Sequence, residues 1–332
     1  MFTKRLIPFR WLAAALIGVS TTVAAQEVVR IQDYPGMGNL MVRVAIANKI
    51  CEKNNIKCEL KVIPNAPLGV QTMLAGDIEV QWGPPEVAIQ AYAKGADIRI
   101  IGGAWRGSIF FLVAGDHLAT PRSGKGYPAV MEDLRGKKIG VTARGTAAEF
   151  QLIELLRGAG MGAKDVTLVG VGSPNTALPA LINKQVDAVM AFEPMGGFCE
   201  ILGGCRMLVD PRKGEGPEQL LAVSNAGSVQ SMRLETLQKK PKMVAAYIAT
   251  MKEAEAFIQN PANYAAVLKI ANDTFKIDVP RGPDVVASVL KNTIGIYRFA
   301  MDAKSVQAAA DYLLASKQMA NPVDTSKLIH QP

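Results

Sequence analysis

Two arginines and two aromatic residues stand in glycine- or proline-rich turns, where they could hold a small anionic ligand. Arg106 lies within residues 105–108 (WRGS), and Arg144 lies within residues 143–146 (ARGT). A guanidinium group donates paired hydrogen bonds to a carboxylate, sulfonate or phosphate. Tyr34 and Trp82 stand in two further turns of this kind and could form an aromatic wall. These residue types indicate binding of an organic acid.

Signatures of catalysis are missing from the same sequence. It contains neither a GxSxG elbow nor a GxxxxGK[ST] phosphate loop, and residues 36–41 lack the third glycine of a dinucleotide fingerprint. His117 and His330 are the only histidines, and neither is placed as the general base that a Ser-His-Asp arrangement needs. The four cysteines lack the spacing of a zinc site. The sequence therefore predicts a protein that is not an enzyme and uses no cofactor or metal.

The scaffold that must position these turns is predicted from alternating apolar segments. Strands are expected over residues 28–31, 59–63, 78–82, 98–101, 109–113, 138–142, 166–169, 188–191, 206–209 and 220–224. Helices are expected over residues 40–53, 68–75, 85–94, 146–158, 176–183, 194–202, 241–259, 261–271, 283–299 and 303–315. The alternation predicts an α/β fold with a largely parallel sheet, and the chain ends in helices.

Open α/β sheets bind ligands at the carboxyl ends of their strands, where helix N-termini add partial positive charge. The residues at these strand ends form the predicted binding site, with Asn39 also expected to cap the helix that follows it. The predicted ligand-binding residues are Tyr34, Asn39, Trp82, Gly83, Pro84, Arg106, Ser108, Arg144, Gly145, Thr146, Ser173, Asn175, Glu193 and Asn225.

The first 25 residues have the pattern of a cleaved secretory signal peptide. A basic start with Lys4, Arg5 and Arg10 precedes a short apolar run over residues 11–19, and Val23-Ala24-Ala25 suits a cleavage site. The protein is therefore expected in the periplasm. Of the remainder, residues 26–112 and 223–332 are predicted to form lobe 1, and residues 113–222 an inserted lobe 2. Two sequential domains are the alternative.

The charge balance argues against nucleic acid as a partner. The net charge of +8 comes from 37 Lys and Arg against 29 Asp and Glu, but three of the basic residues belong to the predicted signal peptide. Residues 113–222 hold as many acidic as basic residues, and the basic clusters over residues 135–138 and 239–242 are short. Nucleic-acid binding needs a longer basic stripe. After the leader, no apolar run is long enough to cross a membrane.

The four cysteines fall into two local pairs. An exported protein meets an oxidising compartment, where disulfides form. Pairing Cys51 with Cys58 and Cys199 with Cys205 leaves each bridge within one helix-to-strand connection. Four free buried thiols are the alternative.

Four segments together resemble a known family. They are GDIEVQWGPP at residues 76–85, DLRGKKIGV at 133–141, RGT at 144–146 and EP at 193–194. In this order they are similar to periplasmic solute-binding proteins of the nitrate, sulfonate, taurine and bicarbonate uptake family, which also includes binders of thiamin-related pyrimidines. The resemblance spans the chain after the leader.

The resemblance implies a type II periplasmic-binding-protein fold, with two Rossmann-like lobes that close on one solute. It further implies that Gly83-Pro84 and Gly145-Thr146 hold the polar end of the ligand and that Glu193 lines the opposite side. The fungal pyrimidine synthases of the same superfamily carry a cysteine-rich motif, whereas this chain has only GGFC at residues 196–199. The enzyme alternative is therefore disfavoured.

The function expected from this resemblance is that of a monomeric substrate-binding component, which delivers a small molecule to the permease of an ABC importer. Arg106 and Arg144 favour an anionic organic solute, such as a sulfonate or an aromatic carboxylate. Glu193, if it faces the cleft, favours an amine-bearing ligand such as taurine or an aminopyrimidine. A binding protein for a thiamin-precursor pyrimidine and a sensor subunit that signals to a receptor are the alternatives.

Overall fold

The structure is a computed structural model that describes residues 1–2, 26–34, 37–223 and 226–331. Almost all of the predicted signal peptide lies outside the described residues, as does Asn225. Within the described part of the chain, no helix is both long and apolar enough to pass through a membrane.

The described strands form three sheets, and two of them share a side of the molecule. β1 (Glu27–Asp33) pairs in parallel with β2 (Ile56–Val62). β10 (Ser228–Arg233) lies between β3 (Gln81–Gly83) and β4 (Ile98–Trp105) and is antiparallel to both. A parallel bridge from Ile31 to Val80 joins the two sheets.

The third sheet has five strands in the order β7-β6-β8-β5-β9. Its strands are β5 (Phe111–Gly115), β6 (Lys138–Val141), β7 (Thr167–Gly170), β8 (Ala188–Ala191) and β9 (Cys205–Val209). β6 is parallel to β7 and β8, whereas β5 is antiparallel to both of its neighbours. The sheet is therefore mixed rather than purely parallel, because the strand that enters it runs against the others.

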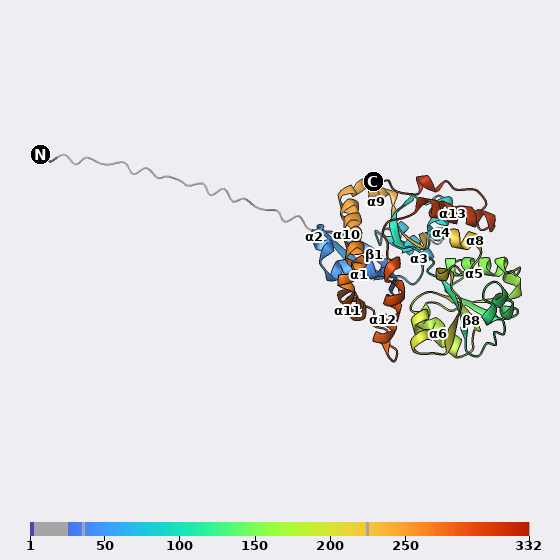
Figure 1. The fold of residues 1–332 in the computed structure, drawn as a ribbon. Helices are drawn as coiled ribbons and strands as arrows, with labels where there is room; N and C mark the ends of the chain where they lie inside the picture. The colour runs from blue at the N-terminus through green and yellow to red at the C-terminus, as the bar shows by residue number, and fades with distance from the viewer. Residues whose placement is uncertain (3–25, 35–36, 224–225, 332) are drawn as a thin grey trace.

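Helices cover these sheets in two groups. Around β1 and β2 lie α1 and α10, while α5 and α6 lie beside β8 in another part of the molecule (Figure 1). The helices of the first part are α1 (Leu40–Ala47), α2 (Ile50–Lys53), α3 (Ala66–Ala75), α4 (Pro85–Ala93), α9 (Leu234–Lys239), α10 (Pro241–Gln259), α11 (Tyr264–Thr274), α12 (Gly282–Thr293) and α13 (Ala303–Ala315). The helices of the second part, which lie in the chain between β5 and β10, are α5 (Ala147–Gly158), α6 (Pro174–Ile182), α7 (Met195–Ile201) and α8 (Glu218–Val223).

The strand predicted over residues 220–224 is wrong. Residues 218–223 form α8, which packs against α13 and α5 and buries Leu220 and Val223. A short apolar run fits a buried strand and a buried helix equally, so its pattern cannot separate them. The strand that returns to the first sheets is β10. It was not predicted, because its polar residues Ser228, Gln230 and Ser231 interrupt the apolar pattern of a buried strand.

Three predicted helices have different limits in the structure. The helix expected over residues 40–53 is two helices, because Lys49 adopts a left-handed backbone conformation with φ of 55°. The helix expected over 261–271 starts as a short 3-10 turn and becomes α11, and the one expected over 283–299 ends at Thr293. In contrast, β8, α10 and α13 have the predicted bounds.

Both cysteine pairs are disulfide-bonded. Cys51–Cys58 joins α2 to β2, and Cys199–Cys205 joins α7 to the start of β9. Each bridge closes a short loop beside a strand.

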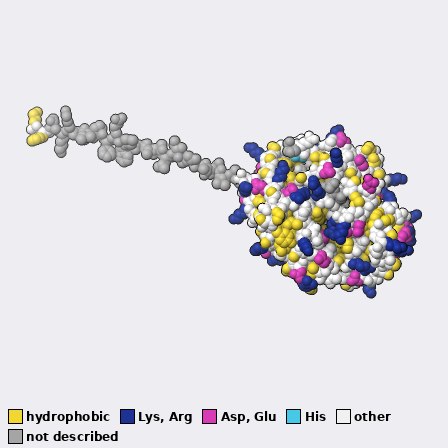
Figure 2. Space-filling view, in the orientation of Figure 1, with side chains coloured by type: hydrophobic (Ala, Val, Ile, Leu, Met, Phe, Trp, Pro, Cys, Tyr) yellow, Lys and Arg dark blue, Asp and Glu magenta, His cyan; other side chains and the backbone are white. Residues whose placement is uncertain are grey.

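The chain passes twice between the first two sheets and the five-stranded sheet. One passage follows β4 and leads into β5, and the other leads from β9 through α8 into β10. We propose from this connectivity the same two lobes, with one boundary between β4 and β5 and the other near α8. The first boundary falls a few residues before the predicted one, because Phe111 and Leu112 already pair within the five-stranded sheet. Figure 2 shows Lys and Arg side chains over one face of the molecule, with Asp and Glu among them.

Candidate functional site

An apolar pocket with four aromatic side chains, called the aromatic pocket below, is lined by residues from both proposed lobes. It is lined by Tyr34, Asn65, Ala66, Pro67, Trp82, Gly83, Pro84, Val87, Ile109, Phe110, Thr142, Thr146, Ala147 and Phe192. Its volume is about 50 Å³, well below the roughly 300–1,000 Å³ of typical ligand sites. An organic ligand therefore needs the two walls to move apart before it can enter. The pocket gathers five of the predicted residues: Tyr34, Trp82, Gly83, Pro84 and Thr146.

Two aromatic pairs form its walls. The rings of Tyr34 and Trp82 meet edge to face with centroids 4.5 Å apart, and those of Phe110 and Phe192 do so at 6.1 Å. Gly38 allows the first wall, because a Cβ at this position would overlap the Trp82 ring. Edge-to-face aromatic pairs give a pocket apolar sides of fixed shape.

Two hydrogen-bond donors in the first wall are buried and have no protein partner among the described residues. They are the hydroxyl of Tyr34 and the indole Nε1 of Trp82. The Gln32 side chain lies beside the Tyr34 hydroxyl and lowers its pKa against the larger effect of burial, but the two do not reach hydrogen-bond geometry. Burial raises the pKa of Tyr34, so the hydroxyl keeps its proton at neutral pH. A buried donor without an acceptor costs free energy, and a ligand oxygen would remove that cost.

Three helices begin at the pocket. α3 starts at Ala66, α4 starts at Pro85 after the Gly83-Pro84 turn, and α5 starts at Ala147. The Thr146 hydroxyl donates to the carbonyl of Ala143 at 2.8 Å and makes no cap to α5. Helix N-termini carry partial positive charge. The lining residues include no Lys, Arg, Asp or Glu, but α4 and α5 each carry a buried acid in the first turn, Glu86 and Glu149, which offsets part of this charge.

The two arginines predicted to clamp an anion do not line this pocket. Arg144 forms an ion pair with Glu149 at 3.0 Å, and its side chain is 67% exposed. The backbone N–H of Gly145 also donates to Glu149, at 2.6 Å. Arg106 is exposed, and its backbone N–H donates to the carbonyl of Ile296 at 2.7 Å. Their charges act away from the aromatic walls.

Four further predicted residues lie near the strand ends but outside the pocket lining. Asn39 is buried, and its amide nitrogen donates to the carbonyl of Gln32. Contrary to the prediction it makes no side-chain cap to α1, because its side chain is turned towards β1. Ser108 is buried and donates to the carbonyl of Phe110 at 2.9 Å. Ser173 and Asn175 stand at the start of α6, where Asn175 is exposed.

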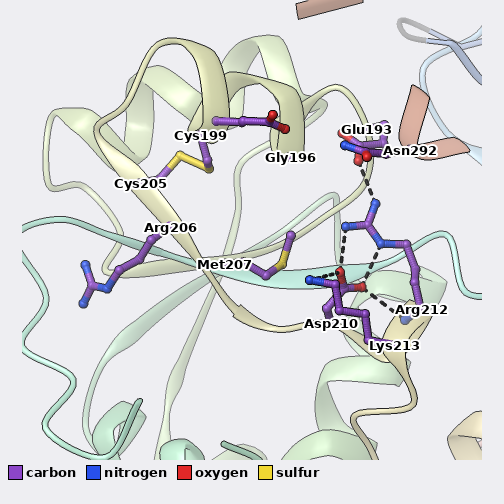
Figure 3. A pocket seen from close by; sticks show the side chains of 11 residues that line it. Glu193, Gly196, Cys199, Cys205, Arg206, Met207, Asp210, Arg212, Lys213 and Asn292 are labelled. Atoms are coloured by element: carbon purple, nitrogen blue, oxygen red, sulfur yellow. Dashed lines mark hydrogen bonds and ion pairs between the residues drawn. A yellow bond between two sulfur atoms is a disulfide. The ribbon is translucent and has the colours of Figure 1, made fainter. Parts of the chain in front are cut away.

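Glu193 lines a different pocket, which Figure 3 shows. Its carboxylate lies 2.7 Å from the guanidinium of Arg212, which also pairs with Asp210 at 2.7 Å. Glu193 is 3% exposed, and burial raises the pKa of its carboxyl although Arg212 opposes that shift. This pocket of about 530 Å³ also includes Cys199 and Asn292. Glu193 thus holds Arg212 in place and does not line the aromatic pocket.

Sequence reasoning missed the second aromatic wall. Phe110 lay inside a predicted buried strand, so it counted as core. Phe192 immediately precedes Glu193, which drew attention as a charged residue. A signal existed, because Phe192 is the first residue after β8, at the same kind of strand end as Trp82.

One buried acid near the pocket lacks a counter-charge. Glu86, in the first turn of α4, is 1% exposed, and neither of its carboxylate oxygens has a hydrogen-bond partner among the described residues. Burial raises the pKa of this carboxyl above its ordinary value of 4.5. Among the described residues, no group of three or more His, Cys, Asp or Glu side chains could hold a metal ion.

The Glu86 carboxyl should make stability depend on pH. Because its folded-state pKa is raised, the folded protein binds this proton more tightly than the unfolded chain does. The contribution of Glu86 therefore stabilises the fold progressively as pH falls from neutrality towards about 4.5. We expect Glu86→Gln to be more stable than the native protein at pH 7.5, with the difference shrinking by pH 5. Urea unfolding at both pH values measures it, and an equal difference at both would contradict the raised pKa.

Comparisons with known proteins identify the family of this chain and its relatives. The model of the family described as NMT1/THI5 like matches residues 44–263. A putative binding protein of Brucella abortus (strain 2308) is 28% identical over 250 residues, which cover 75% of this chain and 70% of that protein.

Two solved structures show what fold this is. The alkanesulfonate-binding protein SsuA from Xanthomonas axonopodis pv. citri, bound to MOPS, superimposes with a TM-score of 0.73 at 19% identity, covering 93% of this chain and 100% of that one. A Candida albicans protein with the generic periplasmic binding protein fold gives 0.69 at 10% identity, covering 91% and 96%. The predicted fold is confirmed.

Proposed function

The chain belongs to the NMT1/THI5-like family, and on that premise we propose that it is the periplasmic substrate-binding component of an ABC importer. Its ligand is a small organic solute with an apolar or aromatic body and an anionic end, either a sulfonate or a carboxylate. The solute binds in the aromatic pocket between the lobes. The predicted signal peptide and the likeness to an alkanesulfonate-binding protein support this proposal.

The observation that carries the proposal is the pair of unpartnered donors in an uncharged pocket. The Trp82 indole N–H has no acceptor among the described residues, and the Tyr34 hydroxyl has only the side chain of Gln32 beside it, without hydrogen-bond geometry. Sulfonate or carboxylate oxygens would accept from both donors. The three helix N-termini favour negative charge at the same place. Phe110 and Phe192 then enclose the body of the solute from the other side.

A thermal-shift screen of alkyl sulfonates, aryl sulfonates, aromatic carboxylates and aminopyrimidines tests this function. A ligand present at about 100 times its dissociation constant stabilises a protein by about 2.7 kcal/mol, which shifts the melting temperature measurably. We expect at least one sulfonate or carboxylate to do so. If no compound raises the melting temperature, and native mass spectrometry finds no co-purified small molecule, the proposal is wrong.

Arg144 is expected to contribute little to binding. Its ion pair with Glu149 is largely exposed, and such pairs contribute about 0–1 kcal/mol. Arg144→Ala should therefore change the dissociation constant of a screened ligand by less than about fivefold. Isothermal titration calorimetry measures this, with Arg135→Ala, which removes another exposed lobe 2 ion pair, as control. A larger loss confined to Arg144→Ala would return this arginine to the binding site.

A thiamin-precursor pyrimidine is the second candidate ligand. The uncharged pocket with its two aromatic walls suits a flat ring as well as it suits an aryl sulfonate. The aminopyrimidines in the same screen distinguish these two possibilities directly, because only one class should give the larger shift.

A further inference from the structure

A second, smaller cavity adjoins the aromatic pocket. It is lined by Pro85, Glu86, Ser108, Gln151, Leu220, Val223, Ala226 and Gly227. The two cavities draw on the same segments, because Pro84 lines one and Pro85 the other, and likewise Ile109 and Ser108. On α5, Ala147 lines the first cavity and Gln151 the second, one helical turn further along. The small cavity therefore lies next to the aromatic pocket, towards the two connections between the lobes.

Three of its polar atoms are acceptors that no described donor reaches with hydrogen-bond geometry. Both carboxylate oxygens of Glu86 and the amide oxygen of Gln151 are buried and have no hydrogen-bond partner among the described residues. Glu86 is 1% exposed and Gln151 is 5% exposed. The Gln151 amide lies beside the carboxyl of Glu86 and lowers its pKa against the larger effect of burial, although no donor in the described part of the chain reaches either Glu86 oxygen with hydrogen-bond geometry. Buried acceptors of this kind cost free energy unless a donor reaches them.

The neighbouring protein donors are used elsewhere. Ser108 donates to the carbonyl of Phe110, and Tyr312, whose hydroxyl senses the charge of Glu86, donates to the carbonyl of Phe150 at 2.9 Å. Arg157 on α5 pairs with Glu154. The remaining side-chain donor of the described protein beside these oxygens is the amide N–H of Gln151, which cannot serve both Glu86 oxygens and its own amide oxygen. A further donor is therefore a water molecule or a group of the ligand.

The size of the cavity restricts what that donor is. Its volume is about 10 Å³, which is about the space of one water-sized probe. A water molecule fits this space. An amino or ammonium group has a similar size and carries two or three N–H donors, so a ligand that brings one would replace the water. A ring or a sulfonate is too large for it.

We infer that Glu86 and Gln151 form a subsite for an amino or ammonium group of the ligand whose body lies in the aromatic pocket. This inference rests on the proposed function and narrows its ligand to amino-bearing acids or aminopyrimidines. Glu86 belongs to α4 in lobe 1, whereas Gln151 belongs to α5 in lobe 2. The amino group is therefore held from both sides only when the lobes are closed, so Glu86 and Gln151 select for amines and favour the closed state together.

Matched pairs of probes test the subsite. Ethanesulfonate is compared with 2-aminoethanesulfonate, and benzenesulfonate with 4-aminobenzenesulfonate, by calorimetry at pH 7. In the native protein we expect the amino compound of at least one pair to bind about tenfold or more tightly than its partner, as a charged hydrogen bond provides. In Glu86→Gln this preference should fall to about one, and in Gln151→Met it should fall in part.

Glu154→Gln is the control. Glu154 is a buried acid on α5, the helix that carries Gln151, and it does not line the small cavity. This variant should keep the preference. Thermal unfolding shows whether each variant is folded. If Glu86→Gln does not fold, the ligand preference of Gln151→Met decides whether the subsite exists. Equal affinity within both pairs, or a preference that survives both cavity variants, overturns the subsite while the proposed function stands. Failure of all four sulfonates to bind overturns the subsite, and the wider screen then decides the proposed function.

Discussion

Replacing Trp82 by alanine should abolish binding of every compound that stabilises the native protein, and should lower the free energy of unfolding by about 3–5 kcal/mol. Trp82 is 5% exposed, stacks edge to face on Tyr34 and fills the space that Gly38 leaves open. The substitution removes a wall of the pocket and one of its two unpartnered donors. Urea unfolding gives the stability change, and calorimetry at a temperature where the variant is folded gives the affinity.

Trp82→Phe separates shape from hydrogen bonding, because it keeps an aromatic ring but removes the Nε1 donor. We expect it to retain most of the stability and to weaken binding by about tenfold, the size of one buried hydrogen bond. Trp105→Phe is the matched control, since the Trp105 indole donates to the carbonyl of Gly38 at 3.1 Å and the residue does not line the pocket. A folded Trp82→Ala protein that binds its ligand with unchanged affinity would show that the pocket is wrongly assigned.

Replacing Arg212 by methionine should lower the free energy of unfolding by about 3–5 kcal/mol at pH 7. Arg212 pairs with both Glu193 and Asp210, which are 3% and 2% exposed, and its guanidinium stacks over the Phe111 ring at 4.2 Å. Without it, two buried carboxylates remain with no paired arginine. Burial raises the pKa of the Glu193 carboxyl, and without Arg212 its protonation relieves part of that cost, so the loss should be smaller at pH 5. Urea unfolding at the two pH values measures both effects.

Arg135→Met provides the comparison for a paired but exposed arginine, and it should cost less than about 1 kcal/mol. A loss of that size in Arg212→Met would show that the Glu193–Arg212 pair does not stabilise the fold. Ligand affinity gives a second test. Arg212 does not line the aromatic pocket, so the folded variant should bind the screened ligand nearly as the native protein does. Selective loss of binding would instead place the ligand in the Glu193–Arg212 pocket.

Most of the scaffold could be predicted from local pattern. β8 consists of four buried apolar residues, and α10 and α13 have amphipathic patterns, α10 with a proline in its first turn. Elements whose buried faces are partly polar could not be predicted. β10 carries Gln230, whose amide bonds to Gly103 and to Tyr247 from distant parts of the chain. Only the tertiary structure provides those partners.

The binding site divides in the same way. Residues 82–84 and Thr146 were predictable because backbone direction brings strand ends and helix starts to one place. The roles of charged residues were not, because each depends on a partner that folding supplies. Arg144 is held by Glu149, and Glu193 is held by Arg212. In contrast, neither carboxylate oxygen of Glu86 has a hydrogen-bond partner among the described residues. The sequence shows Glu86 only as one acid in a predicted helix, so its burial could not be predicted.

The most direct test of the proposed ligand pocket is a crystal structure with the compound that gives the largest thermal stabilisation. We expect the compound between the Tyr34–Trp82 wall and the Phe110–Phe192 wall, with an acceptor atom within hydrogen-bond distance of the Tyr34 hydroxyl or the Trp82 Nε1. A compound bound in the Glu193–Arg212 pocket, with the aromatic pocket as small as it is here, would contradict the proposal.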